Sequence, residues 1–249
     1  MIDLSSNPLC RPFDYAGSRE HGVLILHGFT GSIANMVPFG RYLAAEGFTV
    51  KGISLRGHNG NERAMANVHK EDWIHDALFG FDQLAKQCKK ISVVGLSMGG
   101  ALALYTAANR PVYRAVPVAA ALRVYNRWAP LARIVSPFYP YWQRPSSNEP
   151  SSSQDPFSVG YNGLFFHSVA EFNRLAHQVR RELPKVTCPL LVVRAGHDET
   201  VRPESADWIM QRTSSSQKEL LELPESGHVC VLGNENKLLF QKTAEFLKK

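Results

Sequence analysis

The sequence lacks the features that mark membrane and secreted proteins. None of the apolar runs in its 249 residues approaches the length of a membrane span. Its first residues lack the basic stretch followed by an apolar stretch that begins a secretory signal. We therefore expect no stable membrane insertion and a cytoplasmic location.

Clusters of positive charge are also missing. The net charge is +6, but the lysines and arginines are dispersed, and adjacent pairs such as Lys89-Lys90 are short. Because nucleic-acid-binding domains carry basic stripes or patches, we expect no nucleic-acid partner. The sequence leaves the oligomeric state open.

Cysteine is scarce, and its spacing is not that of a metal site. The four cysteines lie far apart, without paired C-x-x-C spacing. We interpret them as free thiols in a reducing compartment, and we expect no metal and no cofactor. We interpret five histidines as ordinary surface or helix residues, namely His21, His69, His75, His167 and His177.

What the sequence does contain is a regular alternation of buried-strand and helix patterns. Apolar runs typical of strands occur at 23–26, 48–55, 91–95, 115–120, 190–195 and 219–223. Helical patterns occur at 35–46, 71–87, 98–110, 168–183, 204–211 and 238–248. Strand–helix alternation predicts an α/β fold, with a mostly parallel sheet and helices on both faces.

The alternation is interrupted between residues 121 and 183. This stretch is rich in aromatic residues and proline, and its serine-rich part, 145–154, is expected to be mobile. We interpret 121–183 as a cap inserted into a core made of 1–120 and 184–249. Its rings would either form an apolar pocket over the sheet or only pack the insertion onto the core.

Residues 95–99 read GLSMG and fit the G-x-S-x-G pattern of a nucleophile elbow. A strand pattern precedes them and a helix pattern follows, so Ser97 is expected at a sharp strand-to-helix turn. Only small neighbours let a strand and a helix pass so closely. The serine oxygen would then lie beside the helix N-terminus, which favours developing negative charge.

Two further loops at strand ends carry partners for a nucleophilic serine. Asp198 follows the 190–195 strand, and His228 follows the 219–223 strand. The order Ser, Asp, His is that of an α/β-hydrolase triad, in which a carboxylate orients the imidazole that activates the serine. Glu199 remains a rival acid, and His197 is interpreted as structural.

The loop after the first buried strand supplies a candidate for the second donor of an oxyanion hole. It reads HGFTGS at 27–32. The backbone N–H groups of Phe29 and of Met98, the residue after Ser97, would bind the oxyanion. A phosphate-binding loop is excluded because the G-x-x-x-x-G-K-[ST] spacing is absent.

With these motifs assembled, the chain resembles small bacterial carboxylesterases and monoacylglycerol lipases of the α/β-hydrolase superfamily. The resemblance implies an acyl-enzyme at Ser97, with Asp198 as the acid and His228 as the base. It also implies a small-molecule ester substrate and a cap over an acyl pocket. The run RGHNG at 56–60 departs from the R-G-H-G of many monoglyceride lipases, which leaves glycerol recognition open. A perhydrolase, another non-ester hydrolase and an inactive binding protein on the same fold are the alternatives.

Overall fold

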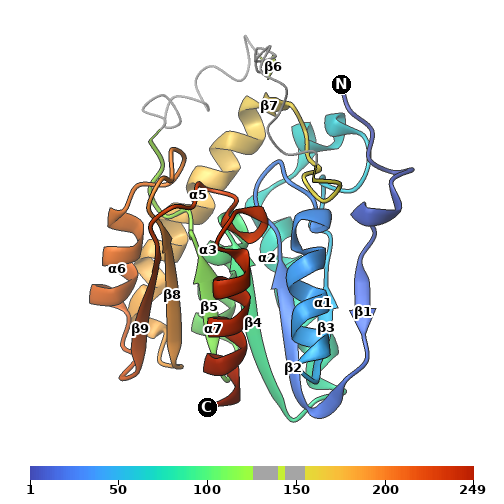
Figure 1. Ribbon diagram of the computed structural model, residues 1–249. Coiled ribbons are helices and arrows are strands. Elements are labelled where there is room, and N and C mark those ends of the chain that lie inside the picture. The colour runs from blue at the N-terminus through green and yellow to red at the C-terminus, as the bar shows by residue number, and fades with distance from the viewer. Residues whose placement is uncertain (126–139, 144–154) are drawn as a thin grey trace.

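One seven-stranded sheet runs through the computed structural model, which describes residues 1–125, 140–143 and 155–249. The strand order is β1-β3-β2-β4-β5-β8-β9 (Figure 1). Every pairing is parallel except that of the edge strand β1 with β3. The strands are β1 (Phe13–Tyr15), β2 (Ser18–Leu26), β3 (Phe48–Gly52), β4 (Lys90–Leu96), β5 (Ala115–Val118), β8 (Leu190–Ala195) and β9 (Lys218–Leu223).

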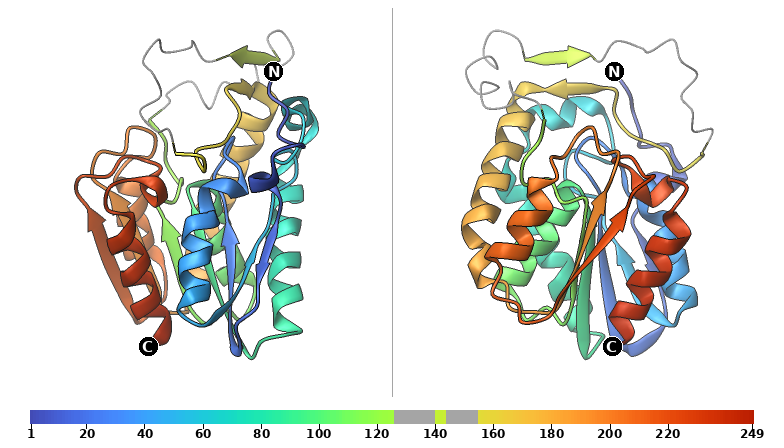
Figure 2. Two further views of the ribbon diagram at one scale, coloured as in Figure 1. Left: turned by 45° about the vertical axis from the view of Figure 1, so that its right-hand side comes forward. Right: turned by 60° about the vertical axis from the view of Figure 1, so that its left-hand side comes forward.

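Helices cover both faces of the sheet (Figures 1 and 2). One face carries α1 (Val37–Ala45) and α7 (Asn236–Lys248). The other carries α2 (Lys70–Ala85), α3 (Met98–Asn109), α5 (Phe166–Glu182) and α6 (Glu204–Arg212). Short 3₁₀ helices occur at Pro8–Cys10, Ile33–Met36, Glu62–Asn67, Leu183–Lys185 and Cys230–Leu232.

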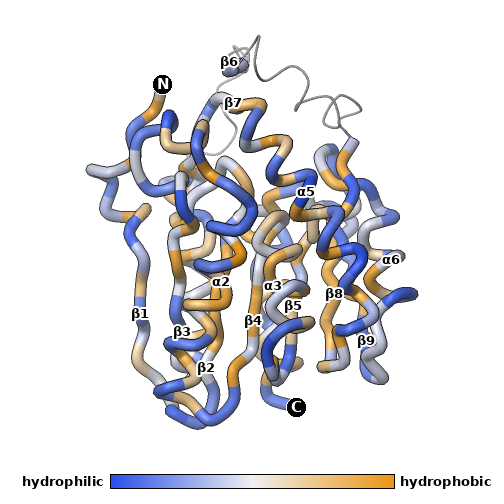
Figure 3. The backbone as a smooth tube through the Cα atoms, turned by 180° about the vertical axis from the view of Figure 1, so that it is seen from behind, coloured by the Kyte–Doolittle hydropathy of each residue, from blue (hydrophilic) through white to orange (hydrophobic). Residues whose placement is uncertain are grey.

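The two faces of the sheet have separate hydrophobic cores. In β2, Val23 and Ile25 pack on the α1 and α7 side, whereas Leu24 and Leu26 pack on the α2 and α3 side. Alternate side chains of a strand point to opposite faces, so a strand covered on both sides must be apolar throughout. Figure 3 shows the hydrophobic colour concentrated in the central strands. The predicted α/β architecture, a mostly parallel sheet with helices on both faces, is confirmed.

The boundaries differ from the prediction where loops or prolines intervene. β3 ends at Gly52 and not at residue 55, because Leu55 belongs to a loop whose backbone is bound elsewhere. The helix predicted at 35–46 is split into a 3₁₀ turn and α1. Pro38, at the start of α1, has no N–H to donate and fits only the first turn of a helix.

The described parts of 121–183 form a small sheet and a crossover helix. The strands β6 (Tyr141–Gln143) and β7 (Gly163–Phe165) pair antiparallel; neither is predicted from the sequence. Helix α5 runs from β7 along α3 and returns the chain towards β8 (Figure 1). The predicted mobility of 145–154, and the rings of Trp128, Phe138 and Tyr139, lie outside the described residues.

The glycines around Ser97 allow backbone segments to touch. A Cβ built on Gly95 would lie 2.1 Å from the carbonyl oxygen of Gly99. One built on Gly99 would lie 2.3 Å from the carbonyl oxygen of Leu26. Real atoms cannot approach so closely, so β4, α3 and the end of β2 can hold these positions only around glycine.

We expect Gly99→Ala to destabilise the protein, because the new methyl group would push α3 away from β2. Overpacking of this kind costs roughly 1–3 kcal/mol of unfolding free energy, occasionally more. The matched control is Gly60→Ala, since a Cβ at Gly60 meets nothing within 4 Å. Urea unfolding monitored by circular dichroism measures both. Equal stability of the two variants would contradict the packing argument.

Candidate active site

Ser97 occupies the turn between β4 and α3. Its backbone dihedrals are φ 57° and ψ −113°, a region that side chains with a Cβ rarely adopt. Such strain persists only where the surrounding structure enforces it, and here Gly95 and Gly99 let the neighbouring segments do so. The turn holds Ser97 at the carboxyl end of the sheet, at the N-terminus of α3.

Two hydrogen bonds connect three of the predicted site residues, with His228 between Ser97 and Asp198. His228 Nε2 lies 2.9 Å from Ser97 Oγ, and His228 Nδ1 lies 2.8 Å from Asp198 Oδ2. An ionised carboxylate can only accept, so Nδ1 carries the proton and Nε2 is free to accept from the serine hydroxyl. The side chains of Asp198 and His228 are 6% and 16% exposed.

The loop after β8 fixes the orientation of Asp198. The other carboxylate oxygen, Oδ1, accepts the backbone N–H groups of Thr200 at 2.8 Å and Val201 at 2.7 Å. Glu199 is exposed at the rim of the same loop. His197 is also exposed, and its backbone N–H donates to the carbonyl of Ser226. The structure thus brings Asp198 to His228, and leaves Glu199 and His197 apart.

The two segments that carry the predicted oxyanion donors lie beside Ser97. A Cβ built on Gly28 would lie 3.3 Å from Ser97 Cβ, so the loop that continues into Phe29 passes directly beside the serine. Met98 is the first residue of α3, where N–H groups have no partner within the helix. The Phe29 loop turns sharply at Thr30, whose φ is 60°.

Two buried imidazoles hold this loop, and sequence reasoning missed this role. His27 Nδ1 donates to the Gly28 carbonyl, and its Nε2 accepts the Leu55 N–H at 3.0 Å. His58 Nε2 accepts the Thr30 N–H at 3.2 Å. Burial lowers the pKa of His27 to about 4. Burial, with a contribution from His27, lowers the pKa of His58 to about 3. Both rings are therefore neutral and keep their acceptor nitrogens at physiological pH.

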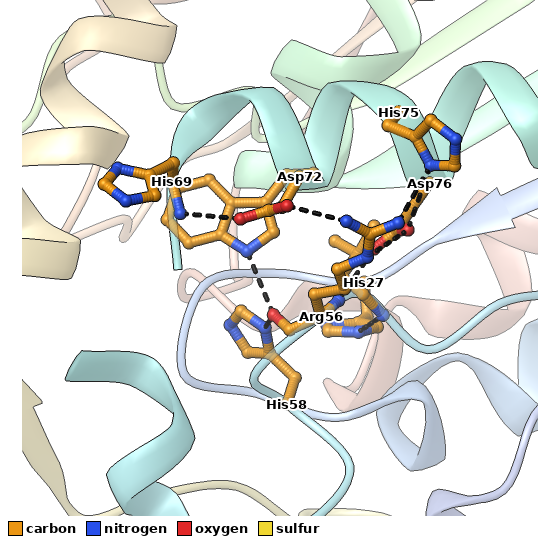
Figure 4. Close-up of polar contacts among 9 residues, drawn as sticks. His27, Arg56, His58, His69, Asp72, His75 and Asp76 are labelled. Atoms are coloured by element: carbon orange, nitrogen blue, oxygen red, sulfur yellow. Dashed lines mark hydrogen bonds and ion pairs between the residues drawn. The ribbon is translucent and has the colours of Figure 1, made fainter. Parts of the chain in front are cut away.

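Arg56 anchors this arrangement to helix α2 (Figure 4). Its guanidinium contacts Asp72 at 2.6 Å and Asp76 at 3.2 Å, both on α2. Its carbonyl accepts the His58 Nδ1–H at 3.0 Å and the Trp73 Nε1–H at 3.1 Å. The RGHNG run thus connects the Phe29 loop to α2, through His58 and Arg56. The signal available in the sequence was a histidine in each polar loop that follows β2 and β3.

A cleft of about 710 Å³ opens above Ser97. The segment that returns towards β7 forms one wall and is bound to the Phe29 loop, with Tyr161 N–H donating to the Thr30 carbonyl at 2.7 Å. Another wall comes from α5, whose Phe172 stacks on Phe29 with ring centroids 5.2 Å apart. The lining includes Leu96, Ala121, Val124, Val159, Tyr161, Phe172, Val229 and Leu232. Polar side chains, among them Asn35, Asn162, Glu199 and Thr200, line the rest, so the cleft is of mixed polarity.

No helix in the described part of the chain is long and apolar enough to cross a membrane.

The chain is similar to several known hydrolases over nearly its whole length. It is 31% identical to a thermostable monoacylglycerol lipase from Bacillus sp. (strain H-257), covering 96% of this chain and 94% of the lipase. It is 28% identical to a carboxylesterase from Bacillus subtilis (strain 168), with 96% of each covered. A solved structure from work on the metagenome-derived lipolytic enzymes LipS and LipT superposes with a TM-score of 0.90. That protein is 28% identical, and the match covers 97% of this chain and 98% of that one.

A family model described as serine aminopeptidase, S33, matches residues 17–236. These residues include the Phe29 loop, the turn at Ser97, and the loops of Asp198 and His228. The chain therefore belongs to the S33 serine aminopeptidase family of α/β-hydrolases.

Proposed function

We propose that this enzyme hydrolyses carboxylic esters through an acyl-enzyme, with Ser97, His228 and Asp198 as its triad. The observation that carries the proposal is the pair of hydrogen bonds from His228 to Ser97 Oγ and to Asp198. The ester class is supported by the names of two relatives, a monoacylglycerol lipase and a carboxylesterase. Short- to medium-chain acyl esters and monoacylglycerols are the proposed substrates.

In this mechanism His228 moves one proton in each direction. Its Nε2 takes the Ser97 proton as Oγ attacks the ester carbonyl, and it returns that proton to the departing alcohol. In the second step His228 takes a proton from water as the water oxygen attacks the acyl-enzyme. It returns that proton to Ser97 Oγ as the carboxylic acid leaves. Asp198 keeps the imidazole in the Nδ1–H tautomer and stabilises the imidazolium formed in each step.

Two backbone amides are proposed to stabilise the negative charge that develops on the carbonyl oxygen of the substrate. The N–H groups of Phe29 and Met98 would donate to the oxyanion, assisted by the N-terminus of α3. A donor of this kind is typically worth ~10²–10³ in rate. The hydrogen bonds of His27 and His58 support this assignment, because they fix the backbone on either side of Phe29.

The insertion at 121–183 is proposed to cover the acyl pocket as a cap. The residues of it that line the cleft, such as Val124, Tyr161 and Phe172, support this.

The cytoplasmic location is likewise a proposal, supported by four free cysteines. Burial raises the pKa of Cys188 to about 11 and that of Cys230 to about 12, so neither is a reactive thiolate at neutral pH.

The proposed activity is tested with p-nitrophenyl esters from acetate upward, beside 1-monoacylglycerols. We expect kcat/KM to rise several-fold per added methylene until the pocket is full, since each buried methylene contributes up to ~0.8 kcal/mol.

Ser97→Ala should lower turnover by ~10⁴–10⁶ and abolish labelling by a fluorophosphonate. Stoichiometric binding without turnover would indicate a binding protein, and near-normal activity of folded Ser97→Ala would exclude the mechanism.

The acid is tested by comparing two neighbouring carboxylates. Asp198→Asn should lower kcat by ~10⁴, because the amide stabilises the wrong imidazole tautomer. Glu199→Gln should have a far smaller effect, since Glu199 is exposed at the rim. Steady-state kinetics on one ester measure both. The reverse ranking would assign the acid to Glu199.

The role of His58 is tested by removing the acceptor of the Thr30 N–H. We expect His58→Ala to lower kcat and kcat/KM together, by about 10- to 100-fold, because a displaced oxyanion donor weakens only transition-state binding. His58→Gln, whose side-chain carbonyl can accept the same N–H, should recover part of the rate. His177→Ala, an exposed histidine on α5, is the control. A raised KM with unchanged kcat would contradict this role.

A further inference from the structure

A cluster of possible metal ligands lies where α5 begins beside the start of α2, apart from the residues of the proposed triad. It consists of His69, His167 and Glu171, and one donor atom of each lies within 4.8 Å of the others. Figure 4 shows His69 at the beginning of α2, with its ring pointing away from Arg56 and His58. None of the three side chains has a part in the proposed ester hydrolysis.

The folded backbone brings the three residues together. His167 and Glu171 are four residues apart on α5 and therefore share one face of that helix. His69 comes directly before α2, and the adjacent Lys70 binds α5 twice. Its N–H donates to Glu171 at 3.1 Å, and its Nζ donates to Gln178 at 2.7 Å. The cluster thus joins two helices that are already held in register.

The carboxylate of Glu171 retains capacity for a further cation. Its side chain is 5% exposed. Oε1 accepts from Arg174 at 2.7 Å, and Oε2 accepts the Lys70 N–H. An ionised carboxylate offers about four acceptor sites. His69 Nδ1 lies 3.9 Å from Oε2, too far for a hydrogen bond but close enough for both atoms to share an ion.

An independent observation comes from His167. Its Nε2 is buried and has no hydrogen-bond partner. In the part of the chain that the structure describes, three other side-chain atoms share this condition, on Ser54, Arg114 and Thr243. Imidazole nitrogen is a common ligand for transition metals, whereas hydroxyl and guanidinium groups are not. The His167 ring lies perpendicular to that of His69, with centroids 5.0 Å apart.

We propose that His69, His167 and Glu171 bind a divalent transition-metal ion, of which Zn²⁺ is the best match. Two imidazoles and one carboxylate are a set of three ligands that zinc accepts, with water in the fourth position. Bonds of about 2.0–2.1 Å place neighbouring donors roughly 3.3 Å apart, so a contraction of about 1.5 Å at most is needed. The His69 side chain is 57% exposed and can rotate to provide it.

The ion would fasten α5 to α2 close to the cleft. Phe172 follows Glu171 directly and stacks on Phe29, whose loop passes beside Ser97. A metal at this point therefore stabilises the helix that forms one wall of the cleft. Its binding does not depend on ester hydrolysis, so the inference can be tested on the folded protein without a substrate.

The test uses the full chain freed of metal with a chelator, and Zn²⁺ or Co²⁺ as the probe. Calorimetry and elemental analysis after gel filtration should give one ion per chain. Co²⁺ should give the visible absorption of a low-coordinate site. Excess Zn²⁺ should raise the thermal midpoint, because an ion that binds only the folded state stabilises it. Absence of binding, or of the thermal shift, would overturn the proposal.

Five variants locate the ion. His69→Ala and His167→Ala should each weaken binding at least ten-fold, and His69→Ala is expected to fold because the residue is exposed. His75→Ala and His177→Ala, exposed histidines on the same two helices, should leave the affinity unchanged. His228→Ala should also bind the ion, which separates this site from the triad. Unchanged affinity in both ligand variants, or equal loss in the controls, would overturn the assignment.

Discussion

The constraint on which the rest of the molecule depends is the contact between three backbone segments at Ser97. The end of β2, the end of β4 and the first turn of α3 meet within atomic contact, which only Gly95 and Gly99 permit. A residue in the backbone conformation of Ser97 costs roughly 1–3 kcal/mol. Cores on both faces of the sheet offset this strain, because β2 and β4 contribute side chains to each.

A second requirement is that two histidines stay uncharged. His27 and His58 each use one nitrogen as a donor and the other as an acceptor, an arrangement that protonation would destroy. Their burial enforces neutrality, since a charged imidazole in a dry interior is far less stable. The loop of Phe29 is thus held in part by side chains that do not line the cleft beside Ser97.

The sequence predicted the fold because its strands are buried on both faces and are punctuated by helices of ordinary length. It also identified the loops that carry Ser97, Asp198 and His228, since the carboxyl ends of parallel strands lie at the same edge of the sheet. It did not reveal the role of His58, because a hydrogen bond to Thr30 joins loops far apart in the chain. It missed β6 and β7, which are too short to show a periodic pattern.

Periodicity also could not reveal the juxtaposition of His69 with α5. A histidine before one helix and a histidine–glutamate pair on another are each unremarkable, and only tertiary packing makes them neighbours. The same holds for Arg56, whose pairing with α2 depends on how the loop after β3 folds back.

The neighbouring positions of β5 and β8 in the sheet have an evolutionary consequence. The connection from Val118 to Leu190 leaves one strand and returns to the strand beside it. Its length is therefore nearly independent of the sheet's geometry, and doubling such a connection costs only ~0.6 kcal/mol in closure entropy. Relatives that share this sheet can therefore differ in the length and sequence of the segment while the strands that lead to Ser97 and Asp198 stay in place.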